Sequence, residues 1–113
     1  MIEDYDFGLM VIGGRRYTRD LILVEDRIYP NWWRKEGHSL CLDDLKVVLN
    51  ERPDILVIGT GYSGVMEVPK EVVEKLESMG ISVIVEPTPK AYKTFNKLLR
   101  EGKRVAGAFH LTC

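Results

Sequence analysis

The hydrophobic pattern of the chain centres on residues 55–58, where four branched aliphatic side chains follow one another without a polar break. A strand with one face in water alternates apolar and polar residues, so this run predicts a strand covered on both faces, in the middle of an α/β sheet. A loop with three glycines, residues 59–64, follows at the carboxyl end of the strand. Open α/β sheets bind ligands at that end, which makes the loop the first candidate site.

Three other segments have the three- and four-residue spacing of apolar side chains that is typical of amphipathic helices. We expect these helices near residues 42–49, 70–79 and 89–101. Gly80 and Gly102 follow the second and third segments and are typical helix stop signals. At the start of the third, we expect Thr88 as the cap and Pro89 as the first helical residue.

Short apolar runs in residues 7–29, with a Gly13-Gly14 connection, predict an N-terminal antiparallel β meander. Residues 81–85 and 104–110 predict two further strands. A strand at 55–58, a helix and a strand at 81–85 form a βαβ unit, so these two strands should be parallel neighbours or near neighbours. The pattern predicts a single α/β domain, residues 1–113, with a mixed sheet and about three helices.

Composition narrows the class of protein. A domain of 113 residues buries roughly 60–70% of its unfolded surface and needs no disulfide or metal to fold. The 16 basic and 17 acidic residues leave a net charge of −1, which argues against bulk-charge binding to nucleic acid or anionic membrane. No apolar run approaches the ~20 residues of a membrane span, and Met1-Ile2-Glu3-Asp4 lacks the basic start of a signal peptide. We therefore expect a cytoplasmic protein without membrane contact. Its high charge content and lack of Gln suggest a thermostable protein.

The glycine loop matches the spacing G-x-G-x-x-G of dinucleotide-binding proteins, and Glu86 ends the next strand, as a ribose-binding acid would. In that motif the helix begins within the glycines, whereas here residues 65–68 intervene before Pro69. Two further interpretations stay open: a turn that only reverses the chain, and a nest of backbone amides that holds a small anion. The candidate ligand-binding residues are Gly59, Thr60, Gly61, Tyr62, Ser63 and Gly64.

Two segments are candidates for contact with a protein partner. Trp32 and Trp33 could anchor an interface, or they could cap one end of the core. Arg34 and Lys35 lie beside them, but two basic residues are too few to favour a site where the tryptophans stack on nucleic-acid bases. A basic row recurs along one face of the last helix, and it is either a solvated face or a surface for an acidic partner or phosphate. This row consists of Lys90, Lys93, Lys97 and Arg100.

The sequence contains no recognisable catalytic motif. Neither H-E-x-x-H nor G-x-S-x-G occurs, and Cys41 and Cys113 lack metal-ligand spacing, so we expect no metal, no cofactor and inert thiols. A hidden site could use Asp20, Asp54, Thr60, Ser63, Glu86 and His110. We interpret His110 as a core-edge residue rather than a general base, and His38 as a solvated loop histidine.

Several stretches resemble a family of small conserved domains of unknown function, which includes prokaryotic hypothetical proteins, a mitochondrial complex I assembly factor and the adipogenesis-associated domain protein. The stretches that carry the resemblance are Pro53-Asp54-Ile55-Leu56-Val57-Ile58-Gly59-Thr60-Gly61, Gly80-Ile81-Ser82-Val83, Ala91-Tyr92-Lys93-Thr94-Phe95-Asn96-Lys97-Leu98 and Glu101-Gly102-Lys103-Arg104-Val105. The resemblance implies a three-layer α/β domain with a central mixed sheet and no established catalytic activity or cofactor.

These observations favour a protein-interaction or assembly module without catalytic activity, with a protein partner or a second copy of the chain bound at the tryptophans or the basic row. The alternative is a small-anion or metabolite-binding domain, possibly a minor enzyme, that uses the Gly59–Gly64 loop.

Overall fold

A five-stranded mixed sheet forms the centre of the computed structural model, which describes residues 1–113. Its strand order is β5-β4-β8-β6-β7. The strands are β4 (Leu21–Val24), β5 (Arg27–Tyr29), β6 (Ile55–Thr60), β7 (Ser82–Glu86) and β8 (Val105–His110). β6 is parallel to both β7 and β8, whereas β4 is antiparallel to β5 and β8. The predicted central position of residues 55–58 is confirmed, and so is their parallel pairing with the strand predicted at 81–85, which begins at Ser82.

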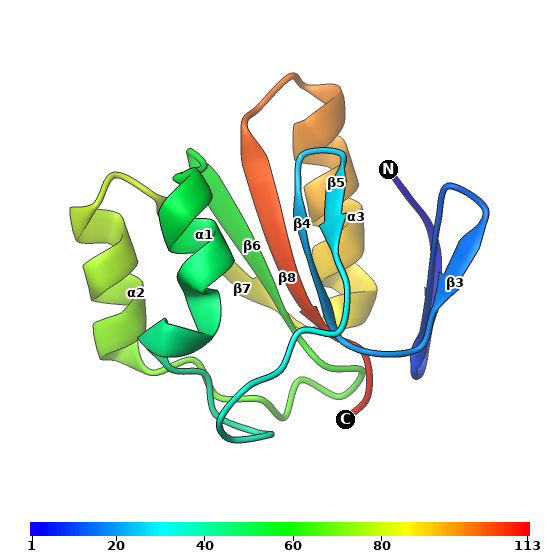
Figure 1. Cartoon of the computed structure of the whole chain (residues 1–113), viewed down its shortest axis with the longest axis horizontal. Helices are drawn as coiled ribbons and strands as arrows, with labels where there is room; N and C mark the ends of the chain where they lie inside the picture. Colours follow the sequence, from blue (N-terminus) through cyan, green and yellow to red (C-terminus); the bar gives the residue numbers. More distant parts are fainter.

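Helices cover both faces of this sheet, as Figure 1 shows. The helical segments are the 3₁₀ turn η1 (Leu42–Leu45), α1 (Lys46–Glu51), α2 (Lys70–Ser78) and α3 (Thr88–Arg100). Leu45, Val48 and Leu76 of the first three segments pack with Leu56 and Ile58 on one face. The predicted helix at 42–49 is therefore present, but its first turn is 3₁₀. α3 packs against the opposite face, so the molecule has three layers.

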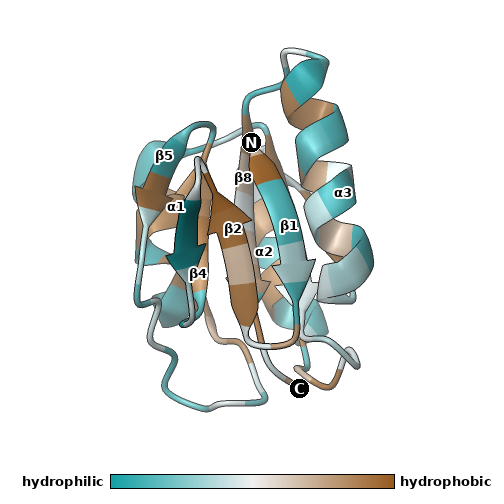
Figure 2. Cartoon of the chain, turned by 90° about the vertical axis from the view of Figure 1, so that its right-hand side faces the viewer, coloured by the Kyte–Doolittle hydropathy of each residue, from teal (hydrophilic) through white to brown (hydrophobic).

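A second, three-stranded antiparallel sheet shares the α3 side of the molecule. It consists of β1 (Ile2–Asp6), β2 (Leu9–Ile12) and β3 (Arg15–Tyr17), and Figure 2 shows β1 and β2 beside α3. The side-chain amide of Asn96 ties β1 to α3, because it accepts from Ile2 N at 2.9 Å and donates to Ile2 O at 2.7 Å. These two hydrogen bonds hold the first strand of the small sheet against α3.

The N-terminal antiparallel structure predicted for residues 7–29 is confirmed with one difference in its arrangement. Residues 9–17 form a hairpin of the small sheet, whereas residues 21–29 form a hairpin of the central sheet. Burial explains this division. All four residues of β4 are buried, so this strand needs cover on both faces, whereas burial alternates along β2.

The start of α3 also differs from the prediction. Helix α3 begins at Thr88 itself, with Pro87 at the cap position, so the interpretation of Thr88 as the cap is wrong by one residue. The Thr88 side chain is fully buried and has another role. Its hydroxyl donates to His110 O at 2.7 Å and accepts from Gly61 N at 2.9 Å. Thr88 therefore joins α3 to the carboxyl ends of β6 and β8.

Candidate functional site

The chain gathers several loops at the carboxyl ends of β6 and β8, the end at which the C-terminus lies in Figure 1. The predicted glycine loop is one of them, but it is shorter than expected, because Gly59 and Thr60 belong to β6. Gly59 allows close packing, since a Cβ there would lie 2.7 Å from Thr88 Oγ1. Gly61 has φ +106°, and a Cβ on it would lie 2.5 Å from the carbonyl oxygen of Cys113. Both glycines are required by close backbone approach.

Three amides of this loop donate to acceptors within the chain. Gly61 N donates to Thr88 Oγ1, Tyr62 N donates to Thr112 O at 2.7 Å, and Gly64 N donates to Gly61 O at 3.2 Å. The Thr60 hydroxyl donates to Glu86 O at 3.3 Å. An anion nest needs these donors unpaired and convergent, so the geometry gives the small-anion hypothesis no support. It also lacks the helix start that a dinucleotide loop needs, because α2 begins only at Lys70.

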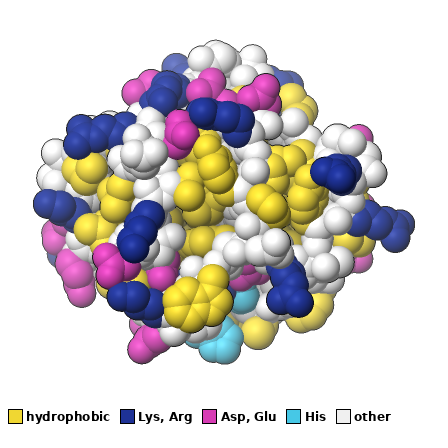
Figure 3. Space-filling model, viewed as in Figure 1, with side chains coloured by type: hydrophobic (Ala, Val, Ile, Leu, Met, Phe, Trp, Pro, Cys, Tyr) yellow, Lys and Arg dark blue, Asp and Glu magenta, His cyan; other side chains and the backbone are white.

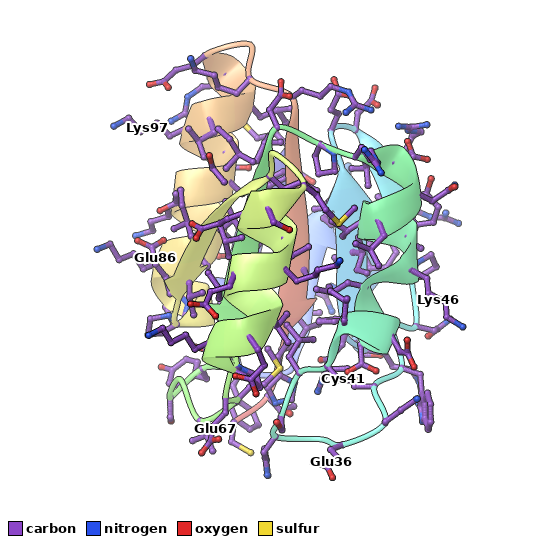
Figure 4. All side chains as sticks on the ribbon, turned by 90° about the vertical axis from the view of Figure 1, so that its left-hand side faces the viewer. Glu36, Cys41, Lys46, Glu67, Glu86 and Lys97 are labelled. Atoms are coloured by element: carbon purple, nitrogen blue, oxygen red, sulfur yellow. The ribbon has the colours of Figure 1, made fainter.

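Residues 61–67, which we call the clamp loop, hold two other segments in place. Val65 N donates to Cys113 O at 3.2 Å, which together with the Tyr62–Thr112 bond fixes the C-terminal segment. On the other side, Glu67 N donates to His38 O at 2.7 Å and Leu40 N donates to Glu67 O at 2.9 Å. Figure 4 shows Glu36 and Glu67 on these neighbouring loops at the same end of the molecule. The glycine loop is thus the turn that positions the segments around the site.

Asp20, Arg34 and His110 form a buried polar cluster beside the clamp loop. Arg34 Nη1 donates to Asp20 Oδ2 at 2.6 Å, and His110 Nδ1 lies 2.8 Å from the same oxygen. Leu111 N donates to Asp20 Oδ1 at 2.8 Å. The side chains of Arg34 and His110 are 5% and 7% exposed. The sequence indicated Asp20 and His110 as candidate site residues but did not place Arg34 with them. Arg34 meets Asp20 only in the folded chain, since 14 positions separate the two residues.

Electrostatics keeps the carboxyl group of this cluster charged. Burial by itself would raise the pKa of Asp20, but hydrogen bonds from His110, the Leu111 amide and Arg34 outweigh it and lower that pKa below its ordinary value. A buried carboxylate paired with a buried guanidinium has little net charge, so the cluster is a rigid, nearly neutral unit.

The two tryptophans divide between the two interpretations. Trp32 is half-buried: its Nε1 donates to Asp44 O at 2.8 Å, and the Arg34 guanidinium lies 4.8 Å from its ring centroid. Trp33 is 76% exposed. Both line a concave site of about 630 Å³, whose other lining residues are Thr18, Arg19, Asp20, Asn31 and Thr112. Trp32 therefore caps the core, while Trp33 stands on the surface at the rim of a hollow.

A second exposed aromatic group lies nearby, which the sequence did not indicate. Phe7 and Tyr62 are 56% and 48% exposed, and their ring centroids are 5.8 Å apart. Thr112 connects this pair to the hollow, because it lines the hollow and its carbonyl oxygen accepts from Tyr62 N. We call Phe7, Trp33, Tyr62 and Thr112 the aromatic surface. Figure 3 shows hydrophobic side chains beside the histidines at the lower edge of one face.

The other predicted residues lie outside this cluster. All four members of the basic row are exposed, and Figure 4 shows Lys97 on the outer side of α3. Lys90 lies 3.5 Å from the carboxylate of Glu86, which also accepts from Thr94 Oγ1 at 2.6 Å. Asp54 precedes β6 and so lies at the opposite end of the sheet, and Ser63 is exposed on the clamp loop.

None of the helices in this fold combines the length and the apolar run needed to cross a bilayer.

Comparison with known families gives one match across nearly the whole chain. Residues 2–110 match the family model described as a protein of unknown function, DUF498/DUF598. The human NADH dehydrogenase (ubiquinone) 1 alpha subcomplex assembly factor 3 is 32% identical over 95% of this chain. This chain spans 58% of that relative's length. A 13 kDa major membrane protein from Francisella tularensis is 26% identical to this chain. The match covers 92% of this chain and 85% of that protein's length.

Among solved structures, a conserved hypothetical protein from Pyrococcus horikoshii has the same fold. It superimposes with a TM-score of 0.83 at 29% identity, and the match covers 100% of this chain and 99% of that one. The α/β architecture with a three-stranded and a five-stranded sheet is therefore a shared one.

Proposed function

Since this chain belongs to the DUF498/DUF598 family of proteins of unknown function, we propose that it is a protein-interaction module of the kind used in assembling larger complexes. The observation that carries the proposal is the 76% exposure of Trp33 at the rim of the 630 Å³ hollow. A solvent-exposed indole is costly to leave in water, and tryptophan is among the residues most enriched at the energetic centres of interfaces.

The surroundings of Trp33 support an interface as well. Asp20 lines the hollow and is held by Arg34 and His110, so a partner would meet a preorganised surface there. The exposed rings of Phe7 and Tyr62 extend the apolar area on the other side of Thr112. Aromatic anchors on a rigid base with polar rim residues are typical of specific protein interfaces.

The name of the human relative agrees with such a role, because it describes an assembly factor for an NADH dehydrogenase. This chain spans 58% of that protein, so the role in assembly is proposed for this chain and the identity of its partner is left to experiment. A cytoplasmic location also stays a prediction, which fractionation of the native cells would test. One relative is named a membrane protein.

A quantitative pull-down from native lysate tests the proposal. The tagged chain, its Trp33→Ala variant and a Lys93→Ala/Lys97→Ala variant are compared at low and high salt, and the captured proteins are quantified by mass spectrometry. We expect a partner whose binding persists at high salt and is unchanged in the lysine variant. Trp33→Ala should weaken this binding by roughly 2 kcal/mol. A partner kept by Trp33→Ala but lost at high salt and in the lysine variant would move the interface to the basic row. If every captured protein is kept by both variants, the aromatic surface is not an interface.

A further inference from the structure

His38, His110 and Cys113 come together at the clamp loop, although they lie far apart in the sequence. One donor atom from each lies within 4.8 Å of the others. Cys113 Sγ is 3.6 Å from His38 Nε2, and the two imidazole rings have centroids 6.3 Å apart. Cys113 was expected to be an inert thiol because the cysteine spacing gives no metal motif. The fold supplies the partners that the spacing does not.

The orientation of the buried histidine makes this group more than a chance cluster. His110 Nδ1 has two neighbours, Asp20 Oδ2 at 2.8 Å and Arg34 Nη2 at 3.0 Å. Arg34 Nη2 carries two protons, one of which it donates to Gly37 O at 3.0 Å. An unprotonated Nδ1 would face Asp20 Oδ2 lone pair to lone pair at 2.8 Å, which is repulsive. The proton therefore belongs on Nδ1, directed at Asp20, and Nε2 keeps its lone pair.

That lone pair has no partner in the protein. His110 Nε2 is buried without a hydrogen bond, and the residue is 6% exposed. A buried polar atom without a partner costs free energy, so such an atom points to a ligand. A carboxylate that holds the far nitrogen of an imidazole is also the usual support of a metal-bound histidine, because it fixes the tautomer and strengthens the ligand.

One of the three donor–donor distances already matches a site for a late first-row transition metal. With metal–sulfur and metal–nitrogen bonds of about 2.3 and 2.0–2.1 Å, the sulfur–nitrogen edge of a tetrahedral zinc site is about 3.6 Å. The observed Cys113 Sγ–His38 Nε2 distance is 3.6 Å. The three donor atoms are up to 4.8 Å apart, so the exposed side chains of His38 and Cys113 have to move about 1 Å toward His110 Nε2 when a metal binds. Two imidazoles and one thiolate are a borderline-soft donor set that favours Zn²⁺, Co²⁺ or copper over Mg²⁺ or Ca²⁺.

We propose that His38, His110 and Cys113 bind one Zn²⁺ ion, with Asp20 as the positioning residue behind His110. On binding, the Cys113 thiol loses its proton to solvent and the thiolate sulfur coordinates the metal. Three protein ligands leave a fourth tetrahedral position for water or for a group from a bound molecule. Both proposals use the Asp20–Arg34–His110 cluster, but the metal ligands are not part of the aromatic surface, so metal binding can be tested without any protein partner.

Cobalt titration tests the site directly. The probe is Co²⁺ added to the full chain, with no polyhistidine tag and with both cysteines reduced, followed by absorption spectroscopy and then by competition with Zn²⁺. We expect one Co²⁺ per chain, a thiolate-to-cobalt charge-transfer band in the near ultraviolet, and loss of that band when Zn²⁺ is added.

The two ligands that are replaced, His38 and Cys113, are exposed, so these variants are expected to fold. Cys113→Ser should abolish the charge-transfer band. His38→Ala should weaken Co²⁺ binding more than about a hundredfold, beyond the roughly 10–100-fold cost of losing a supporting residue. Cys41→Ser is the matched control and should keep both the band and the affinity, because Cys41 is not part of the cluster. The absence of a charge-transfer band at saturating Co²⁺ overturns the proposal, and so does a band that survives Cys113→Ser. In either case the Cys113–His38 contact is an ordinary thiol–imidazole hydrogen bond.

Discussion

Thr88 offers the sharpest test of how the clamp loop is held. Its hydroxyl is fully buried and is bonded to two backbone groups, Gly61 N and His110 O. Thr88→Val keeps the shape of the side chain but leaves the buried Gly61 amide without an acceptor, which costs about 1–3 kcal/mol. The lost donation to His110 O adds about 1 kcal/mol. We therefore expect the free energy of unfolding to fall by about 2–4 kcal/mol.

Thr94→Val on the same helix is the matched control for this substitution. Thr94 is only half-buried, and the Glu86 carboxylate to which it donates also has Lys90 3.5 Å away. We expect a loss of about 1 kcal/mol for this variant. Urea denaturation measures both, with an unchanged slope showing that only stability has changed. Amide hydrogen exchange at Gly61 gives a second readout, since this amide should exchange faster in Thr88→Val. Equal losses in the two variants, with no change at Gly61, would refute the role assigned to Thr88.

Three further predictions concern the site. Gly61→Ala should lower the free energy of unfolding, measured by urea denaturation, more than Gly80→Ala does. Both glycines have positive φ, but only at Gly61 does the added Cβ meet backbone atoms. Equal losses of stability would contradict this close approach. Trp32→Ala should lower the free energy of unfolding by about 2 kcal/mol and Trp33→Ala by under about 0.5 kcal/mol; similar losses would contradict the division into core and surface. Folding lowers the pKa of Asp20. The ionised carboxylate therefore stabilises the protein above the unfolded pKa of about 3.9, and this stabilisation is lost as the pH falls through the lower folded pKa. Asp20→Asn should remove this part of the acid dependence of stability, and an unchanged pH profile would contradict the prediction.

A melting panel addresses the small-anion hypothesis. The amides of Gly61, Tyr62 and Gly64 and the Thr60 hydroxyl bond within the chain, so sulfate, phosphate, carboxylates, NAD and ATP should leave the melting temperature unchanged. A site occupied at a hundredfold excess over its dissociation constant would instead stabilise the protein by about 2.7 kcal/mol. A shift of that size, abolished by Gly61→Val, would restore the loop as a ligand site.

The architecture was accessible from the sequence because its strongest signals are local. The unbroken run at 55–58 requires cover on both faces, and the apolar spacing of residues 89–101 requires a helix, so the sheet centre and α3 could be predicted. The separation of residues 9–17 from 21–29 could not, because it depends on which faces other segments cover. Strand β1 was missed for a similar reason: Ile2–Asp6 has three acidic residues, and Asn96 in α3 holds its start.

The site was harder to predict, because long-range contacts assemble it. The Gly59–Gly64 motif lies at the end of the sheet where the Asp20–Arg34–His110 cluster forms, but Gly59 and Gly61 allow close packing against Thr88 and Cys113. His110 and Cys113 carry no signal by spacing, since their partners Asp20 and His38 are 90 and 75 residues away. Only the fold shows that these side chains meet.

Site-specific photocrosslinking in the native cell tests the interaction proposal most directly. A photoreactive phenylalanine analogue is placed at position 33 or position 7 of the aromatic surface, at position 97 of the basic row, and at position 85, an exposed apolar control on β7. We predict that one specific protein crosslinks at positions 33 and 7 and not at positions 85 or 97. Crosslinks that are absent at 33 and 7, or equally strong at all four positions, would contradict it.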